Sequence, residues 1–288
     1  MMIIANPRAG HGAGAGSIEK LRGLIRRRGL DCTAVPTERP GHATELARQF
    51  AANGPRLAVM GGDGTISEVV QALVGTEVEL AVIPMGTGND VARSLGLPRN
   101  DMEAALSIAV EGRAKPIDVG RERDRCFISV LGIVFPALVA AEANRMRFPR
   151  GSAAFFVAVY KGLHRLRAVP LEIVLDEETL RLDCVAVMIQ NTPYTGGGLH
   201  MAPDARVDDG LFDVVIVEKI GRLDLMVNFP KVYKGRHFEH PSFSLQRSRT
   251  VTIRSPEPIE KMFDGDLCGW TPVEAEVVPG GLKIVLPA

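Results

Sequence analysis

The sequence predicts a two-domain protein, in which an α/β domain with a parallel sheet is followed by a domain resembling a β-sandwich. Two observations predict this: strand and helix patterns alternate in the first third, and short apolar runs between turn residues fill most of the rest. The 288 residues, 46% of them hydrophobic, also exceed the roughly 250 residues at which single cores usually divide. We expect domains at 1–118 and 119–288, with the last strand or two packing back on the first domain.

Charge and cysteine content narrow the class of protein. The 34 Lys and Arg residues balance 34 Asp and Glu residues, so the chain has no overall attraction for nucleic acid, and we expect no such partner. No run of ~18 apolar residues and no signal-peptide pattern occurs, so we expect a cytoplasmic protein, peripheral at most at the inner face of the membrane. Isolated cysteines favour free thiols over a zinc site or disulfides: Cys32, Cys126, Cys184 and Cys268.

The first third repeats a strand, a loop and a helix. An apolar run at 2–5 precedes a glycine-rich loop and a helix whose apolar residues at 18, 21, 24 and 25 form one stripe. A second strand at 30–35 precedes a helix with apolar residues at 43, 46, 47 and 50. This alternation predicts parallel strands with helices on the faces of the sheet.

A glycine-rich corner follows the third strand, which we expect at 57–60. Gly61, Gly62 and Gly64 let the backbone turn sharply and approach a ligand, and the first amides of the next helix suit a phosphate. Asp63 would repel that phosphate unless a divalent cation lay between them, which predicts Mg²⁺ held directly or through water. The alternative is that Asp63 only caps the helix.

A second glycine-rich corner follows the next strand, at 79–83. It reads Pro84-Met85-Gly86-Thr87-Gly88-Asn89-Asp90-Val91-Ala92-Arg93. Ligands of open parallel sheets bind at the carboxyl ends of the strands, so we expect both corners to face one crevice.

These two corners, together with Asn6-Pro7-Arg8-Ala9-Gly10, resemble the diacylglycerol kinase catalytic family. The similarity is to its bacterial lipid kinases rather than to the sphingosine kinases, whose first corner usually reads SGDG. NAD kinases and phosphofructokinases share the GGDG corner, but the second corner of this chain is not typical of either family. The resemblance covers essentially the whole chain and implies a Rossmann-like parallel sheet of the NAD kinase and diacylglycerol kinase type, followed by a β-sandwich-like domain.

The resemblance also implies a nucleotide-binding set. Thr37 enters it through the segment Thr-x-x-x-Gly-His-Ala, and His11 departs from the pattern because a lysine or arginine is common there. The implied nucleotide-binding residues are Asn6, Pro7, Arg8, Ala9, Gly10, Thr37, Gly61, Gly62, Asp63, Gly64, Thr65, Glu68, Thr87, Asn89 and Asp90.

The pattern changes after a helix expected at 101–111. Most of the remaining chain reads as strands with turn residues between them, interrupted by helices at 153–166 and 223–233. The expected strands are 127–131, 171–175, 180–190, 211–217, 250–254, 259–263, 273–278 and 282–286.

An acidic segment at 202–213 ends in Asp208-Asp209-Gly210-Leu211-Phe212-Asp213. It is either a hydrated turn or a cation site, since hard cations bind a carboxylate plus backbone carbonyls at tight turns. The family resemblance implies a structural Mg²⁺ on the Asp209 side chain and the carbonyls of Arg206 and Leu211. It also implies that Asp118 helps hold metal-bound waters; the alternative is a turn residue.

Two acids separated by a glycine, Asp264-Gly265-Asp266, follow the strand expected at 259–263. Phosphoryl transfer needs a carboxylate that takes the proton of the acceptor hydroxyl. The family motif is usually Asp-Gly-Glu, whose acids supply the base, so the resemblance implies Asp264 and Asp266 as the catalytic pair. The shorter second acid leaves open which one reaches the hydroxyl.

Apolar stretches at 135–141 and 155–160 flank three arginines: Arg145, Arg147 and Arg150. They form either an apolar lipid cleft with a basic rim at a membrane surface, or ordinary core beside a solvated loop.

The sequence therefore predicts an ATP-dependent, Mg²⁺-assisted lipid kinase that phosphorylates a hydroxyl of a lipid such as diacylglycerol. The alternatives are an NAD kinase-like phosphotransferase and a non-catalytic lipid- or nucleotide-binding protein. An exposed sheet edge in the second domain leaves room for a homodimer.

Overall fold

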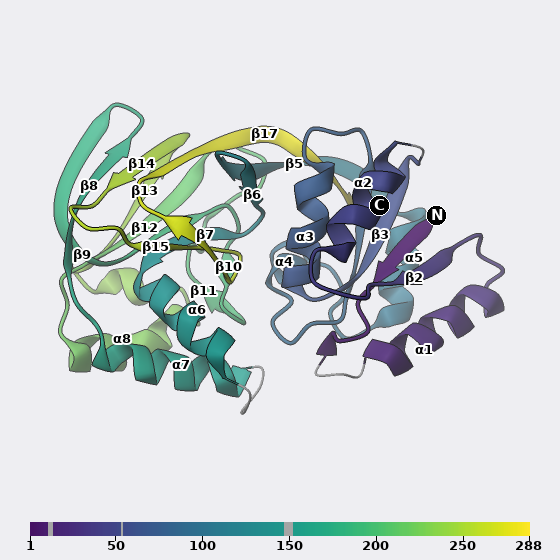
Figure 1. Cartoon of the computed structure of the whole chain (residues 1–288), viewed down its shortest axis with the longest axis horizontal. Helices are drawn as coiled ribbons and strands as arrows, with labels where there is room; N and C mark the ends of the chain where they lie inside the picture. Colours follow the sequence, from purple (N-terminus) through teal and green to yellow (C-terminus); the bar gives the residue numbers. More distant parts are fainter. Residues whose placement is uncertain (11–13, 53, 147–151) are drawn as a thin grey trace. The chain divides into compact units, whose positions relative to one another are not determined.

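The computed structural model describes residues 1–10, 14–52, 54–146 and 152–288. The chain forms two compact units (Figure 1). The first contains Met1–Ile117 and Gly280–Ala288, and the second contains Asp118–Pro279. The predicted position His11 and the arginines Arg147 and Arg150 lie outside the described residues.

A parallel sheet forms the centre of the first unit. Its strands are paired in the order β2-β1-β3-β4-β17. After their first residues, β1, β3 and β4 are buried throughout, as expected for central strands of a sheet covered on both faces. The strands are β1 (Met2–Ala5), β2 (Thr33–Pro36), β3 (Arg56–Gly61), β4 (Glu79–Pro84) and the end of β17 (Val273–Leu286).

Helices cover both faces of this sheet (Figure 1). The apolar stripe of α1 (Gly14–Arg27) packs with α5 (Met102–Glu111) against one face, where Ile3 and Met60 are fully buried. Helices α2 (His42–Ala51) and α3 (Asp63–Leu73) contact each other and cover the opposite face. Short α4 (Asp90–Ser94) follows the second glycine corner.

Antiparallel strands form most of the second unit. The 13-residue strand β9 pairs with β8 along its first half and with β7 and β12 along its second half. The strands are the end of β5 (Arg113–Glu122), β6 (Arg125–Phe127), β7 (Val130–Val134), β8 (Val169–Leu175), β9 (Glu178–Gln190), β10 (Tyr194–Thr195), β11 (Leu199–His200), β12 (Phe212–Glu218), β13 (Phe243–Ser248), β14 (Thr250–Arg254), β15 (Glu260–Phe263), β16 (Asp266–Trp270) and the start of β17.

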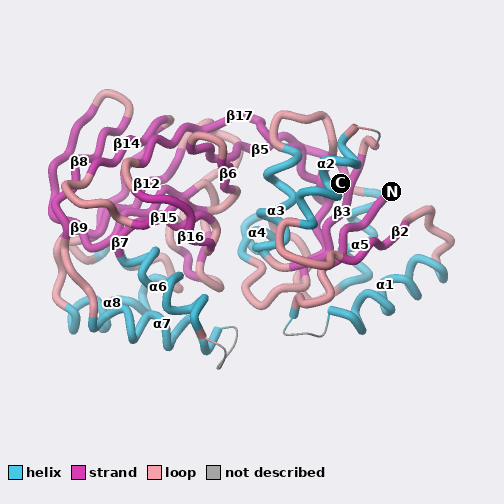
Figure 2. Tube along the Cα trace, viewed as in Figure 1, coloured by secondary structure: helices cyan, strands magenta, loops and turns pink. Residues whose placement is uncertain are grey.

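Two apolar cores lie on opposite faces of these strands. One is built around the rings of Phe127, Phe212 and Phe263, with the first two stacked at a centroid distance of 5.5 Å. The other lies under three helices, which Figure 2 shows gathered on one side of the strands. These helices are α6 (Phe135–Arg145), α7 (Ser152–His164) and α8 (Arg222–Val232). The expected fold class is confirmed in both units.

Several element predictions were wrong for physical reasons. The expected strand 127–131 is divided between β6 and β7, because the backbone amides of 128–130 donate to the carboxylate of Asp264. The strands expected at 273–278 and 282–286 are one strand, β17, and β16 was not predicted.

The apolar stretch at 135–141 belongs to a helix, α6, that the sequence analysis did not predict. Phe135, Ala137 and Val139 are buried in the core under the helices, as are Ala158 and Val159 of α7. These side chains are therefore core residues. No helix among the described residues is long and apolar enough to cross a membrane.

A buried histidine lies in the segment of the chain between α8 and β13. His237, in the short 3₁₀ helix His237–Glu239, is fully buried; its Nε2–H donates to the Met201 carbonyl at 3.0 Å and its ring packs against Phe238 and Phe243. Its Nδ1 is buried and has no hydrogen-bond partner among the described residues. Protonation would bury an unpaired charged donor, so burial lowers the pKa of the imidazole to about 4.

We therefore expect stability to depend on His237 in mildly acidic solution. The neutral imidazole stabilises the fold fully above the ordinary pKa of 6.5, and this stability is lost as pH falls toward about 4. Between about pH 7.5 and about pH 5, the loss should be about 2 kcal/mol greater in wild type than in His237→Gln. Urea unfolding of both proteins at each pH measures the difference; equal pH slopes would contradict the prediction.

Candidate active site

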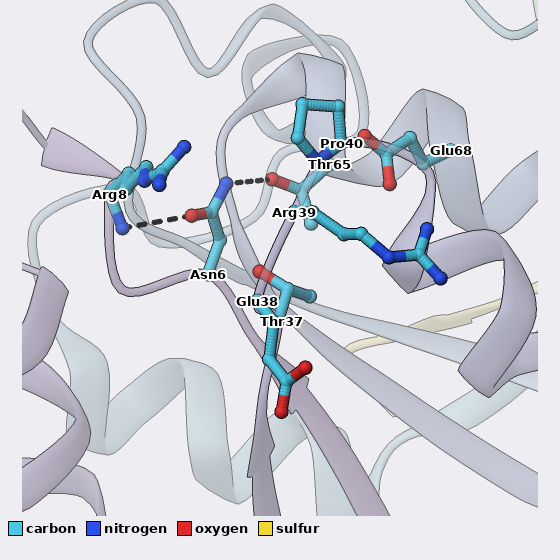
Figure 3. A pocket seen from close by; sticks show the side chains of 8 residues that line it. All are labelled: Asn6, Arg8, Thr37, Glu38, Arg39, Pro40, Thr65 and Glu68. Carbon is cyan, nitrogen blue, oxygen red and sulfur yellow. Dashed lines mark hydrogen bonds between the residues drawn. The ribbon is translucent and has the colours of Figure 1, made fainter.

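A pocket opens beside the carboxyl ends of β1, β2 and β3 in the first unit (Figure 3). Its cavity volume is about 100 Å³, and it brings together five residues predicted to bind nucleotide: Asn6, Arg8, Thr37, Thr65 and Glu68. Its remaining lining residues are Glu38, Arg39 and Pro40. The sequence analysis missed these three, although they lie within the segment that singled out Thr37.

Hydrogen bonds fix the polar wall of the pocket. Asn6 Nδ2 donates to Thr65 Oγ1 at 2.8 Å, and Asn6 Oδ1 accepts from the Arg8 amide at 2.9 Å (Figure 3). The Thr37 amide donates to the Ala5 carbonyl at 2.8 Å, which holds the end of β2 against β1. The turn at Pro7 is closed by the Ala9 amide, which donates to the Asn6 carbonyl, and Gly10 follows with a left-handed φ of 59°. The chain is thus held close to the first helical turn of α3.

Glu68 has a second role beside lining the pocket. Its carboxylate accepts from the Ala43 amide at 3.2 Å, and its carbonyl accepts from Thr44 Oγ1 at 2.7 Å. Both donors are in the first turn of α2, where backbone amides lack helical partners. Glu68 therefore fixes α2 against α3 at the rim of the pocket.

The two glycine corners are in direct backbone contact. A Cβ built on Gly86 would lie 2.6 Å from the Cα of Gly62, and a Cβ built on Gly62 would lie 3.0 Å from the Cα of Gly86. The Met85 amide donates to the Gly61 carbonyl at 2.7 Å, which fixes the corners side by side. The structure therefore brings together the two loops that the sequence predicted to share one crevice.

Side chains in the corners mainly hold the loops. Asn89 has a φ of 49°, and its amide group bonds both the N–H and the carbonyl of Gly86. Asp63 Oδ1 accepts a hydrogen bond from the Val91 amide at 3.1 Å, and Val91 lies in α4, directly after the second corner. Asp63 therefore bonds to the other corner and does not cap its own helix. Asp90 is buried, with Arg93 at 3.9 Å, whereas Thr87 is exposed. Thr87 is thus the more accessible of these side chains.

Close contact between the corners predicts that Gly86→Ala destabilises the first unit. The new methyl group would meet backbone and the Asn89 oxygen at 2.8 Å, so we expect the free energy of unfolding to fall by about 1–3 kcal/mol. Gly64→Ala is the matched control, because its Cβ would meet no described atom within 4 Å and alanine favours the helix. Urea unfolding compares them, and equal stabilities would contradict the packing argument.

The turn between β15 and β16 is fixed by Asp264. Asp264 and Gly265 have φ values of 49° and 99°, as both central residues of a type I′ hairpin require. The Asp264 carboxylate accepts three backbone N–H groups at 2.8–3.0 Å, and its own amide donates to the Val130 carbonyl. These three donors occupy both oxygens of the carboxylate and hold the turn in place. The donors are the amides of Ile128, Ser129 and Val130.

Asp266 differs from Asp264 in exposure and contacts. Its side chain is 63% exposed, and the described contact of its carboxylate is with Arg125 Nη2 at 3.5 Å. The Arg125 guanidinium also lies 5.3 Å from the centre of the Phe263 ring, just before the turn. Asp266 therefore has a carboxylate available to a ligand, on a turn that Asp264 holds in place.

The acidic turn predicted to hold a cation lies beside Asp118. The buried Asp118 carboxylate accepts from the Gly210 amide at 2.6 Å, and its backbone amide donates to the Val207 carbonyl at 2.6 Å. Asn191 Nδ2 donates to the Asp118 carbonyl at 2.9 Å. The structure thus brings the two predicted metal-associated segments together.

The donor set of this turn suits a hard cation. Gly210, with a φ of 72°, turns the chain so that Asp209 and Leu211 are on one tight bend, and all three predicted ligand atoms are oxygens. The Asp209 carboxylate also accepts from the Leu211 amide and forms an ion pair with Arg247. No cluster of three His, Cys, Asp or Glu side chains occurs within the described part of the chain, so a cation here would depend on the carbonyls of Arg206 and Leu211.

The sequence analysis did not predict that the Asp213 carboxylate would be buried without a hydrogen-bond partner among the described residues. The carboxylate is buried at the start of β12, 3.7 Å from Arg247 Nε, and neither oxygen accepts a hydrogen bond from any described residue. Burial raises its pKa to about 6, against the opposing charge of Arg247. A single acid at the start of an apolar strand was the only signal, and it does not reveal missing partners.

Comparison with known proteins agrees with this arrangement. Residues 1–121 match a model of the diacylglycerol kinase catalytic domain, and residues 130–286 match the YegS C-terminal NAD kinase beta sandwich-like domain. A diacylglycerol kinase of Mycobacterium tuberculosis is 36% identical over 99% of this chain and 94% of its own. One of Staphylococcus aureus is 30% identical over 94% and 87%.

Solved structures show the same similarity. The crystal structure of a diacylglycerol kinase from Bacillus anthracis strain Sterne aligns with 99% of this chain and 96% of its own, with a TM-score of 0.74 and 25% identity. Together these matches confirm the family resemblance drawn from the two glycine corners. The chain belongs to the diacylglycerol kinase family and is a kinase.

Proposed function

We propose that this kinase transfers the γ-phosphate of ATP to the hydroxyl of a lipid such as diacylglycerol. The observation that carries the proposal is the convergence of Asn6, Thr37 and Thr65 on one pocket beside two touching glycine corners. Polar side chains, close backbone approach and the first turn of α3 suit a nucleotide with its phosphates. The names of the relatives support a lipid acceptor.

Each group has a distinct task in the proposed reaction. The glycine corners and the first amides of α3 bind the phosphates, while Asn6 and Thr65 orient the nucleotide. The acceptor oxygen forms a bond to the γ-phosphorus as the bond from that phosphorus to the bridging oxygen breaks, and ADP leaves. The proton of the acceptor hydroxyl passes to a carboxylate.

Asp266 is the proposed proton acceptor. The Asp266 carboxylate is exposed and remains accessible beside Arg125. Both oxygens of Asp264, in contrast, already accept hydrogen bonds from backbone amides. Asp264 is the positioning residue, because it fixes the hairpin turn that carries Asp266. Under this proposal, Asp266 is the acid of the Asp-Gly-Asp motif that reaches the hydroxyl.

Mg²⁺ is the proposed metal. Asp209, with the carbonyls of Arg206 and Leu211, would hold one ion at the acidic turn, with Asp118 beside it. A further ion on the phosphates, associated with Asp63 through water, would spread the charge that develops in transfer. The hydrogen bonds from Asp118 of β5 to Val207 and Gly210 hold the acidic turn against that strand.

A panel of acceptors tests the proposal. Purified protein is incubated with Mg²⁺ and γ-labelled ATP, and either extracted lipids, diacylglycerol presented at a membrane surface, or NAD. Label in the lipid fraction is expected. Label in NAD alone would replace the proposal by the soluble-nucleotide alternative, and no labelled product with either acceptor would favour a binding protein.

A further inference from the structure

Two hairpins of the second unit contact each other beside Asp266. In the β5–β6 hairpin, Glu122 lies directly opposite Arg125. In the β15–β16 hairpin, Phe263 lies directly opposite Asp266, and Lys261 is two residues before Phe263 on the same strand. Residues opposite each other in an antiparallel pair share a face, as do residues two apart in one strand. Each hairpin therefore presents its charged side chains on one face.

A buried ion pair holds the two hairpins together. Glu122 Oε1 lies 2.9 Å from Lys261 Nζ, and both side chains are only 4% exposed. Lys261 Nζ also lies 3.5 Å from the Pro272 carbonyl and 5.8 Å from the centre of the Phe263 ring. Removing one member of a buried pair leaves an uncompensated charge, so the two side chains stay together in the folded protein. The pair therefore fixes β6, and with it Arg125, against β15.

Arg125 lies over Phe263 and beside Asp266. Its guanidinium carbon is 5.3 Å from the centre of the Phe263 ring, and its Nη2 is 3.5 Å from Asp266 Oδ2. The ring itself is fixed, because Phe263 is buried and meets Phe127 edge-on with 6.2 Å between ring centroids. A guanidinium over an aromatic ring is held by cation–π attraction as well as by packing. The Arg125 cation thus has a defined position on a rigid support of core side chains.

The Asp266 carboxylate has few contacts of its own. Its side chain is 63% exposed and follows directly after the turn between β15 and β16. Within the part of the chain that the structure describes, Arg125 is the residue that contacts this carboxylate. An exposed side chain occupies several rotamers unless another group orients it, whereas a general base must lie within hydrogen-bond distance of the proton it accepts. Arg125 supplies the orienting contact.

We propose that Arg125 is a positioning residue for phosphoryl transfer, which holds the Asp266 carboxylate in the orientation that accepts the proton of the lipid hydroxyl. Arg125 acts through Asp266 and does not itself touch the substrate. The inference rests on the proposed function, in which Asp266 is the proton acceptor. Bases in active sites are commonly oriented by a third group in this way. A direct contact of Arg125 with the phosphates is the competing role, and the experiment distinguishes the two.

A double-mutant cycle between Arg125 and Asp266 tests the proposal. Arg125→Met keeps the packing over Phe263 and removes the cation, so we expect kcat to fall about tenfold, since a misplacement of 1 Å can cost about 10²-fold. The KM values for ATP and for diacylglycerol should stay within about twofold of wild type. In the Asp266→Asn background, Arg125→Met should change kcat by less than about twofold, because no base is left to orient. Steady-state transfer from γ-labelled ATP measures all four proteins.

Arg121→Met is the matched control. Arg121 is on the same hairpin, but its guanidinium pairs with Glu276 at 2.6 Å on the protein surface. This variant should keep the wild-type kcat. Urea unfolding shows whether each variant is folded, and Arg125→Gln replaces Arg125→Met in the cycle if the methionine variant does not fold.

Three results would overturn the inference. They are wild-type kcat in Arg125→Met, a tenfold loss that persists in the Asp266→Asn background, and an equal loss in Arg121→Met. A persistent loss together with a raised KM for ATP would assign Arg125 to the phosphates instead.

Failure of the proposed function gives a different pattern. If wild type labels no lipid, or Asp266→Asn turns over like wild type, the proposed function or its base is refuted, and the role of Arg125 falls with it. If wild type and Asp266→Asn behave as expected while Arg125→Met keeps full turnover, only the inference fails.

Discussion

Replacing Asp266 by asparagine is expected to lower kcat by about 10²- to 10⁴-fold, the usual contribution of a general base. Asparagine has nearly the same size but cannot take the proton of the acceptor hydroxyl. Because the Asp266 side chain is exposed and its described partner is Arg125, the change should leave the fold intact. Steady-state transfer to a lipid acceptor, with nucleotide binding by calorimetry, measures both effects.

Asp266→Glu is the matched control for this prediction. It keeps the carboxylate and restores the length of the acid that the family motif usually has at this place, so we expect activity within about tenfold of wild type. Asp266→Asn should also remove the acidic limb of the pH–rate profile. Wild-type turnover in Asp266→Asn, or an equal loss in Asp266→Glu, would rule out Asp266 as the base.

Replacing Asp264 by alanine is expected to reduce stability and turnover together. The change leaves three backbone amides without an acceptor, in a segment where Ile128, Ser129 and Val130 are all at most 5% exposed. Each unpaired buried donor costs about 1–3 kcal/mol, so the free energy of unfolding should fall by about 3 kcal/mol or more. Urea unfolding and steady-state kinetics measure the two losses.

Asp264→Asn separates the positioning role from a catalytic one. Asparagine suits the left-handed turn position, and its single oxygen can still accept the Ser129 and Val130 amides that bond to Oδ1. We expect stability between wild type and alanine and an unshifted pH–rate profile in the remaining activity. An acidic limb lost in Asp264→Asn but kept in Asp266→Asn would exchange the two roles.

Local chemistry made the glycine corners and their strands predictable. Gly61 and Gly62 follow an apolar run and precede a helix, and each of these features acts over a few residues. Asp264-Gly265 has the composition of a tight hairpin turn. These signals do not depend on distant parts of the chain, so they could be read directly.

Partners distant in sequence could not be predicted. The break between β6 and β7 depends on Asp264, more than 130 residues away, and the second role of Glu68 depends on the amide of Ala43. The helix α6 was missed because its apolar residues are spaced much like those of a buried strand. The exposure of Leu223 depends on which side of α8 meets the core, and apolar residues occur on both sides.

The strand β17 has a consequence for synthesis of the chain. Its residues Lys283 and Ile284 pair with β4, and the Gly281 carbonyl accepts from the Gly75 amide. Until these residues leave the ribosome, β4 is an open edge of the first unit's sheet, and such edges invite pairing with other chains. Although domains generally fold in order of synthesis, the first unit to be translated is therefore the last to be completed.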